Sequence, residues 1–288
     1  MSADGTIRPI LMSPEEGAMK FFLAIIACAA LAVSASAQGR GMAAIPERPQ
    51  QQTFDTSKGP VKITPLYNAS MLIEIPGTQV YIDLAKPVAF DDLPVAHFLL
   101  ITDTNPGHMD ADAIEVVSTA GARGTRVVAP AAVLKDPKVS KTIGDNTSGA
   151  KELANGESDM VDHRNGWTVE AAPMYTVNHK MPNGQPYYPK GRGNGYILTF
   201  GDKRFYFSGD TEGTPEMRSL KNIDVAFVCM NAHTMSPEEA ADAVKAFHPK
   251  VVIPYDYQGS DPQIFAKALE GTGIEVRLLD WYSDKYKK

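Results

Sequence analysis

The chain has 288 residues, of which 43% are hydrophobic and 22% are charged. This content can bury a large core, so the sequence excludes a mainly disordered protein and fits one large domain or two modest ones. The 34 acidic residues outnumber the 28 basic ones, for a formal net charge of −6, and this balance does not favour a nucleic-acid partner.

Residues 1–37 have the pattern of a leader with a secretory signal peptide. Lys20 precedes an apolar stretch at 21–33, and the small residues of 35–37 follow, so we expect cleavage after Ala37. The apolar stretch is shorter than the roughly 20 residues that span a bilayer, which disfavours a membrane anchor. We therefore expect a periplasmic or secreted protein, with no stable membrane association after cleavage.

The cysteines allow no internal disulfide in a chain that has lost this leader. Cys28 lies inside the leader, so only Cys229 remains. The surrounding residues, IDVAFVCMN, indicate a buried strand. We expect the Cys229 thiol to pack in the core rather than to act as a nucleophile.

Residues 38–60 are polar and rich in Gln, Pro and Gly, which predicts a flexible linker before one domain at 61–288. The domain opens with two β-branched runs on either side of a Pro-Gly pair, as in a β-hairpin or meander. The continuous apolar run AHFLLIT at 96–102 predicts a strand covered on both faces, and the acids at 110–112 favour a helix start. TRVVAPAAVL predicts another strand and a short helix.

The second half of the domain alternates strands and helices. Residues 141–165 are polar and predict turns and edge strands, and the next strands include a pair hinged at Gly201-Asp202. NIDVAFVCM predicts a buried strand, and Ser236 begins a helix as its cap, with Glu239 three residues later. KVVIPYDY, DPQIFAKALEGTG and IEVRLLDW then predict a strand, a helix and a last strand.

The order of these elements indicates the fold class. Strands come first, helices and strands are then intermixed, and half-buried and fully buried strands are both present. This order predicts an α+β fold: an αββα sandwich of two mixed β-sheets with helices on the outer faces, rather than a doubly wound parallel sheet. We find no internal sequence repeat.

Polar residues follow three of the expected strands. They lie at 103–108 after HFLLIT, at 208–211 after RFYF, and at Asp256 after VVIPY. A single aspartate after a strand is more often a turn or cap residue than a ligand. Because three strand ends each supply a carboxylate or an imidazole, we expect one shared polar pocket.

Several motifs resemble those of the metallo-β-lactamase-fold hydrolases, in particular a branch similar to the ascorbate-6-phosphate lactonases. The resemblance covers about Val61 to Trp281 and depends on NASMLIE…VYIDL, LLITDTNPGHMD, GRGNGYIL, FYFSGDTEGTPEM and PKVVIPYDY. It implies the αββα fold and a hydrolase that acts on a small ester or lactone-type bond. Together with the predicted leader, this gives an exported hydrolase.

The resemblance also implies a metal site, although the ligand pattern of this chain departs from that of the family. The family holds up to two metal ions through histidines and aspartates. At the corresponding positions this chain has Asp103, Asn105, Gly107, His108, Asp210 and Asp256. We expect His108, Asp210, Asp256 and Asp103 to hold one divalent ion (Zn²⁺, Mn²⁺ or Fe²⁺) or none. Carboxylates in place of imidazoles favour ions harder than Zn²⁺.

Asp103, Asp210 and His108 are the expected catalytic residues. A bound ion would lower the pKa of a coordinated water and polarise a carbonyl, and Asp103 would orient that water or take its proton. Without an ion, the crowded aspartates would repel one another and raise at least one pKa, which favours metal-independent acid/base catalysis. A third interpretation is a non-catalytic protein that keeps the fold and binds a ligand.

Four further residues are candidates for binding a small-molecule substrate: His179, His233, Tyr188 and Arg192. Each has a structural alternative. His179 fits an exposed loop, His233 a capping or packing role, and Tyr188 and Arg192 a solvated loop.

Overall fold

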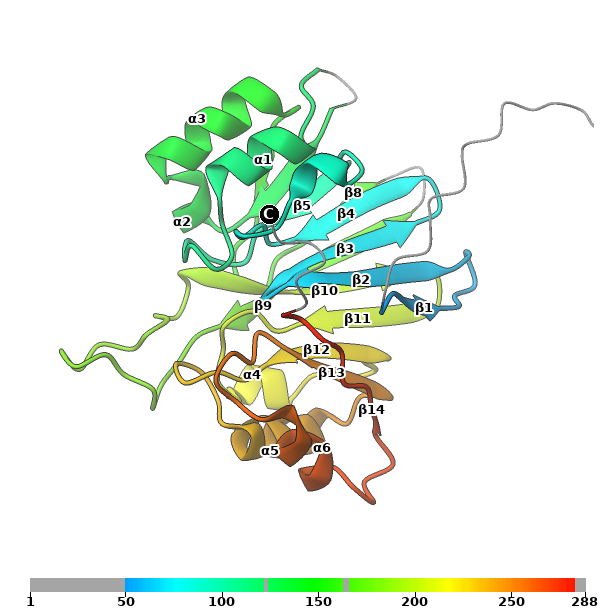
Figure 1. Ribbon diagram of the computed structural model, residues 1–288, viewed down its shortest axis with the longest axis vertical. Coiled ribbons are helices and arrows are strands. Elements are labelled where there is room, and N and C mark those ends of the chain that lie inside the picture. The colour runs from blue at the N-terminus through cyan, green and yellow to red at the C-terminus, as the bar shows by residue number, and fades with distance from the viewer. Residues whose placement is uncertain (1–49, 122–123, 163–165, 283–288) are drawn as a thin grey trace, which may run out of the picture. The chain divides into compact units, whose positions relative to one another are not determined.

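The structure is a computed structural model, and it describes residues 50–121, 124–162 and 166–282. All the elements below lie in one compact unit, Pro46–Lys288. Two seven-stranded β-sheets form its centre (Figure 1).

The first sheet joins an antiparallel meander to a parallel half. Its strand order is β1-β2-β3-β4-β5-β6-β7, antiparallel from β1 to β4 and parallel from β4 to β7. The strands are β1 Gln52–Phe54, β2 Val61–Tyr67, β3 Ser70–Ile75, β4 Thr78–Ile82, β5 Phe98–Leu100, β6 Arg126–Ala129 and β7 Ala150–Glu152.

The second sheet has the same plan. Its order is β14-β13-β12-β11-β10-β9-β8, antiparallel from β8 to β11 and parallel from β11 to β14. The strands are β8 Ser158–Asp162, β9 Trp167–Met174, β10 Gly193–Phe200, β11 Lys203–Phe207, β12 Val225–Cys229, β13 Val251–Tyr255 and β14 Glu275–Val276. The two halves therefore have the same topology, although we find no internal repeat in the sequence.

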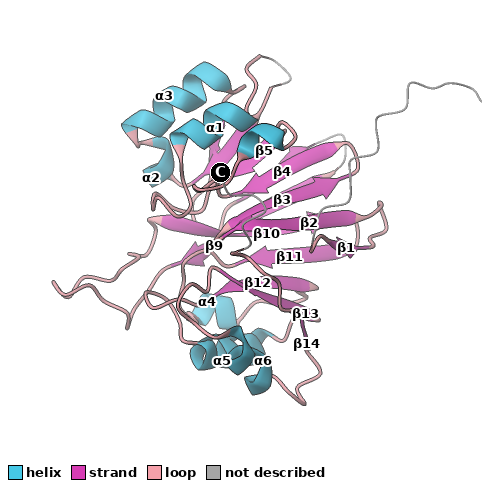
Figure 2. Ribbon diagram, viewed as in Figure 1, coloured by secondary structure: helices cyan, strands magenta, loops and turns pink. Residues whose placement is uncertain are grey.

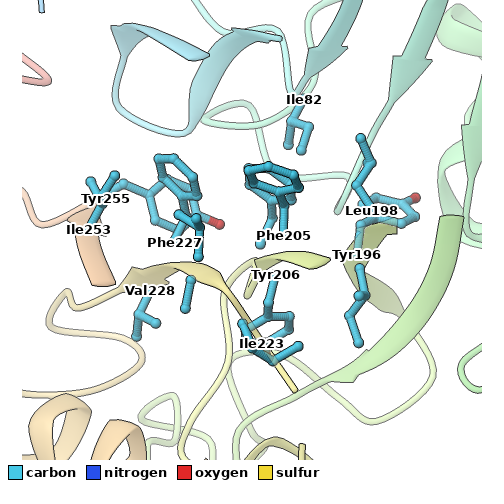
Figure 3. Packing of buried hydrophobic residues seen from close by; sticks show 14 of the residues in the cluster. Ile82, Tyr196, Leu198, Phe205, Tyr206, Ile223, Phe227, Val228, Ile253 and Tyr255 are labelled. Atoms are coloured by element: carbon cyan, nitrogen blue, oxygen red, sulfur yellow. The ribbon is translucent and has the colours of Figure 1, made fainter. Parts of the chain in front are cut away.

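The main core lies between the sheets. Figure 3 shows Phe205 of β11 and Phe227 of β12 pointing toward the side of Ile82 from β4, whereas Tyr206 and Val228 point the other way. This alternation follows from the two-residue period of a strand. Both faces of β12 are buried along its whole length, which explains why its sequence, VAFVC, is continuously apolar. In β11 the same holds only from Phe205 to Phe207.

Helices cover the outer face of each sheet (Figures 1 and 2). Side chains of η1, α1, α2 and α3 pack on the first sheet, and those of α4, α5 and α6 pack on the second. Their bounds are η1 Phe90–Asp92, α1 Ala111–Val117, α2 Ala131–Leu134, α3 Pro137–Asn146, α4 Pro215–Arg218, α5 Pro237–Phe247 and α6 Pro262–Ala268. The predicted αββα sandwich is confirmed.

Two helix starts agree with their sequence signals. Asp110 caps α1 by accepting from the backbone N–H groups of Asp112 and Ala113. Ser236 and Glu239 form the complete capping box of α5.

Three expectations about the elements were wrong in detail. Within 141–165, where we expected only turns and edge strands, residues up to Asn146 belong to α3, whose cap is Asp136. The segment expected to be a flexible linker contains β1, which pairs with β2 and buries Phe54. The last strand is only Glu275–Val276. The predicted leader at 1–37 lies outside the described residues.

Within the part of the chain that the structure describes, no helix combines the length and the apolar character needed to cross a bilayer.

Candidate metal centre

Polar side chains gather where the parallel strands of both sheets end. Residues that follow β4, β5, β11, β12 and β13 are, in that order, Asp83, Asp103, Asp210, Asn231 and Asp256. His108 lies between β5 and α1. C-terminal strand ends flanked by loops are the usual place for a site in sheets of this kind.

Three of the predicted ligands meet in a buried group. His108 Nε2 lies 3.0 Å from Oδ2 of Asp210 and 3.9 Å from Oδ2 of Asp256. One ligand atom from each of the three residues lies within 4.8 Å of the others. The side chains come from both sheets, so the group forms only when the whole sandwich is folded.

The other ring nitrogen of His108 is held by Asp83. Nδ1 lies 2.7 Å from Oδ2 of Asp83 and 3.0 Å from the Thr102 hydroxyl. Thr102 in turn donates its backbone N–H and its hydroxyl to the two oxygens of Asp83, at 2.8 and 2.7 Å. An Nδ1–H directed at a carboxylate leaves Nε2 as the ligand atom. Asp83 was not predicted, although it directly follows the buried end of β4.

Asn231 joins the two carboxylates of the group. Its Nδ2 donates to Oδ1 of Asp210 at 3.2 Å and to Oδ2 of Asp256 at 3.0 Å. Asp256 has a φ of +45°, in the left-handed region that aspartate tolerates better than most residues. Asn231 was also missed, because an asparagine two residues after a strand is an ordinary turn signal.

Burial and charge act against each other in the pKa values of the group. Burial lowers the pKa of His108, but the carboxylates of Asp210 and Asp83 outweigh it and hold that pKa well above its ordinary value. Burial raises the pKa of Asp210, but His108 outweighs it and the result is a lowered pKa. Burial and the charge of Asp210 raise the pKa of Asp256. A cation in the group would therefore displace protons.

Asp103, the fourth expected ligand, is not among the three. Its Oδ1 accepts from Nη2 of Arg192 at 2.5 Å and from the backbone N–H of Asn105 at 2.8 Å. The side chain is completely buried, and Oδ2 has no hydrogen-bond partner. Asp103 therefore lies outside the three-residue group, with its charge paired with a guanidinium, and its role as a metal ligand stays a prediction.

Tyr188 connects the Asp103 region to the group. Its hydroxyl accepts from Nδ2 of Asn105 at 3.2 Å, and the charge of Asp210 acts on the same hydroxyl. Burial and the negative charge of Asp210 raise the pKa of Tyr188, so its hydroxyl stays protonated and can donate. Its place beside the group is compatible with the predicted contact to substrate.

The two remaining candidates lie around this region with other partners. His179 Nδ1 is 3.0 Å from Oε1 of Glu212, and its Nε2 is 3.7 Å from Oε2 of Glu239. His233 is exposed and stacks on Tyr187, with ring centroids 4.3 Å apart. Neither histidine belongs to the three-residue group, and their binding of substrate stays a prediction.

Cys229 is buried at the end of β12, as predicted. Burial raises the pKa of its thiol to about 12, so the reactive thiolate is not formed near neutral pH.

A family model described as the beta-lactamase superfamily domain matches residues 62–256 of this chain. The chain belongs to the metallo-β-lactamase superfamily. A metal-dependent hydrolase of Anaeromyxobacter dehalogenans is 29% identical over 255 residues, which are 78% of this chain and 86% of that protein.

Two solved structures are similar to this chain. A protein of Parabacteroides distasonis assigned as a metal-dependent hydrolase is 32% identical, with a TM-score of 0.68, over 81% of this chain and 99% of that one. Igni18, a metallo hydrolase of Ignicoccus hospitalis, is 22% identical, with a TM-score of 0.61, over 77% of this chain and 96% of that one. The second likeness shows the fold alone.

The donor set of this metallo-β-lactamase superfamily member fits a divalent ion. His108 presents Nε2 while Asp83 holds Nδ1, and Asp210 and Asp256 present carboxylate oxygens toward the same point. One imidazole and two carboxylates are a ligand set that Mn²⁺, Fe²⁺ and Zn²⁺ accept, with water completing the shell.

Proposed function

We propose that the protein is a hydrolase that uses one divalent metal ion and cleaves a small ester or lactone-type bond. The observation that carries this proposal is the buried group of His108, Asp210 and Asp256. Similarity to metal-dependent hydrolases over most of the chain supports the reaction class. The substrate class comes from the resemblance of the motifs.

The residues of the site have separable roles in this reaction. When bound, the ion supplies a water of lowered pKa and polarises the substrate carbonyl. His108, Asp210 and Asp256 hold the ion, and Asp83 fixes the orientation of the imidazole. The Tyr188 hydroxyl donates a hydrogen bond beside the group.

One carboxylate oxygen of Asp103 has no hydrogen-bond partner. Arg192 and a backbone N–H take its Oδ1, while Oδ2 is buried and unpartnered. In this proposal Oδ2 accepts a proton or a hydrogen bond from that water. Asp103 is therefore a base rather than a ligand.

Metal content and chelation test this function. The purified protein should carry one divalent ion per chain and hydrolyse members of an ester and lactone panel, and a chelator should abolish both. Asp210→Asn should lose the ion and the activity. The control Asp202→Asn makes the same change at the exposed β10–β11 turn and should keep both.

Two other outcomes would support a different function. Turnover that survives complete removal of metal selects acid/base catalysis by the aspartates and His108. An intact protein that binds no metal and turns over nothing on the panel selects the ligand-binding alternative.

We also propose that the protein is exported. Support comes from the sequence alone: a basic residue at 20, the apolar stretch 21–33 and the small residues before Gln38. When the whole chain is produced in a bacterium with a periplasm, the periplasmic fraction should contain protein that begins at Gln38. Ala37→Arg should block this processing. Cytosolic protein with an uncleaved leader would contradict export.

A further inference from the structure

The structure buries a carboxylate that the metal-binding group does not use. Asp103 is fully buried, and its Oδ2 lacks any hydrogen-bond partner. A buried charge of this kind is strongly unfavourable unless a cation compensates it. The cation beside it is Arg192, whose Nη2 lies 2.5 Å from Oδ1.

The chain itself fixes the guanidinium of Arg192 in this place. Nη1 donates to the backbone carbonyl of Tyr187 at 3.2 Å, and the guanidinium carbon lies 5.5 Å from the centre of the Tyr188 ring. The next residue, Gly193, begins β10 beside the carboxylate: a Cβ there would stand 3.1 Å from Oδ2 of Asp103. Arg192 is thus anchored independently of its ion pair.

This ion pair adjoins the group of His108, Asp210 and Asp256. Asn105, whose backbone N–H donates to Asp103, also donates its side chain to the Tyr188 hydroxyl, and the negative charge of Asp210 acts on that hydroxyl and raises its pKa. The region between the group and Asp103 therefore holds the Tyr188 hydroxyl and the carboxylate of Asp103, while the amide oxygen of Asn105 accepts from the backbone N–H of Gly107. If the guanidinium were absent, a divalent cation would find the unpaired carboxylate of Asp103 there, beside the oxygens of Tyr188 and Asp210.

We propose that Arg192 is a built-in counter-cation that neutralises Asp103 and keeps a second metal ion out of the site. The inference rests on the proposed one-metal function and explains why that site stops at one ion. In this role Arg192 is not available to bind an anionic substrate, because its positive charge is already paired with Asp103.

The test is metal stoichiometry, measured by elemental analysis after gel filtration and by calorimetric titration with Mn²⁺. The wild-type protein should take up one ion per chain. Arg192→Ala should take up two, and Arg192→Lys, which keeps a positive charge, should take up one. The double variant Arg192→Ala/Asp103→Asn should return to one ion, because the carboxylate that the second ion needs is gone.

Lys190 provides a matched control. It lies two residues before Arg192, but its ammonium pairs with Glu216 at 2.6 Å, away from Asp103. Lys190→Ala removes the same charge from the same loop and should leave the stoichiometry at one ion.

Thermal melting gives a readout that does not depend on activity. Without metal, Arg192→Ala should melt below the wild type, because Asp103 is left buried and unpaired. Added Mn²⁺ should raise its melting temperature more than it raises that of Lys190→Ala. If Arg192→Ala is partly unfolded without metal, its melting temperature should be low and should rise when Mn²⁺ is added.

The inference and the proposed function fail in different ways. If Arg192→Ala still binds one ion at saturating Mn²⁺ and gains no extra stabilisation, the counter-cation role is wrong. A raised KM with unchanged stoichiometry would overturn it in favour of substrate binding. Absence of metal from the wild-type protein would instead overturn the proposed function.

Discussion

At the scale of single residues, the imidazole of His108 is held between acids of the two sheets. Asp83 of the first sheet holds Nδ1 at 2.7 Å, and Asp210 of the second faces Nε2 at 3.0 Å. The arrangement assigns opposite roles to the two ring nitrogens. One nitrogen is fixed by a carboxylate and the other is directed at the place where an ion would be held.

Asp83→Asn tests this positioning. The amide keeps the shape of the side chain but loses the charge that orients and polarises the imidazole, so metal affinity should fall by about 10- to 100-fold. Calorimetric titration measures the change. Asp145→Asn, an exposed position on α3, is the control and should leave affinity unchanged. Equal affinities in both variants would mean that Asp83 does not orient the ligand.

The pH dependence of stability provides a second test at this scale. Without metal, the folded protein binds the His108 proton more tightly than the unfolded chain, whose pKa is near the ordinary 6.5. The stabilisation is complete below that value and is lost as pH rises through the raised folded pKa. Asp256, whose pKa is also raised, acts in the same direction.

With a chelator present, the free energy of unfolding should therefore fall as pH rises above 6.5, by up to about 1.4 kcal/mol per pH unit for each proton lost. With Mn²⁺ present, the extra stabilisation should grow with pH, because the ion replaces those protons. Urea unfolding at a series of pH values measures both. A metal-free protein that becomes more stable over this range would contradict the raised pKa values.

At the scale of elements, β10 approaches the site closely because it begins with a glycine. A Cβ on Gly193 would stand 2.1 Å from Cε of Met174 and 2.8 Å from the carbonyl oxygen of Thr102. The methionine can move, but the carbonyl belongs to the backbone that leads into Asp103. The start of β10 therefore packs directly against the backbone of the site.

Gly193→Ala should therefore destabilise the protein by about 1–3 kcal/mol, the usual cost of overpacking, and weaken metal binding with it. Gly144→Ala is the control: it lies in α3, with nothing within 4 Å of the added Cβ. That change should be neutral or stabilise by up to about 1 kcal/mol. Denaturant unfolding measures both, and equal effects would show that Gly193 carries no steric constraint.

The elements also show which features the sequence could predict. Strands buried on both faces and the capping box of Ser236 have strong local signals, so their positions were predicted well. The helix α3 was missed because Val139 and Ile143 are its only buried residues in a polar stretch. Strand β1 was missed because a three-residue edge strand is stabilised by its pairing with β2 rather than by its composition.

The residues of the site also differ in how well the sequence predicts them. His108, Asp210 and Asp256 were predicted because each lies at or just after the end of an apolar strand or in a recognisable motif. The pairing of Asp103 with Arg192 was not predicted, because it joins residues 89 positions apart and depends on how the two sheets meet. Local patterns indicate which side chains are candidates, and tertiary contacts decide which charges are already neutralised.

At the scale of the whole molecule, both sheets contribute equivalent edges to the site. Each sheet has an antiparallel half and a parallel half, and the acids follow the parallel strands of each. Asp83 directly follows β4, and Asp210 comes three residues after β11, the strand that takes the place of β4 in the second sheet. The site is therefore acidic from both sides, and a bound cation would reduce the repulsion between these side chains.

The charge distribution predicts which substrates the site accepts. The chain carries a formal net charge of −6, and the loop cations Arg192 and Lys190 are both paired with carboxylates. A substrate anion would gain little attraction there and would meet the field of the surrounding acids. We expect kcat/KM for a neutral nitrophenyl ester to exceed that for an analogue with a terminal carboxylate by about tenfold at low salt.

Salt separates this electrostatic preference from one based on shape. Raising the ionic strength screens charges that lie farther apart than the Debye length, about 10 Å at 0.1 M, so the preference for the neutral ester should shrink. A preference unchanged by salt would assign the selectivity to the shape of the site. Faster hydrolysis of the anionic ester would show that a cation of the site is free to bind it, contrary to the pairing of Arg192 with Asp103.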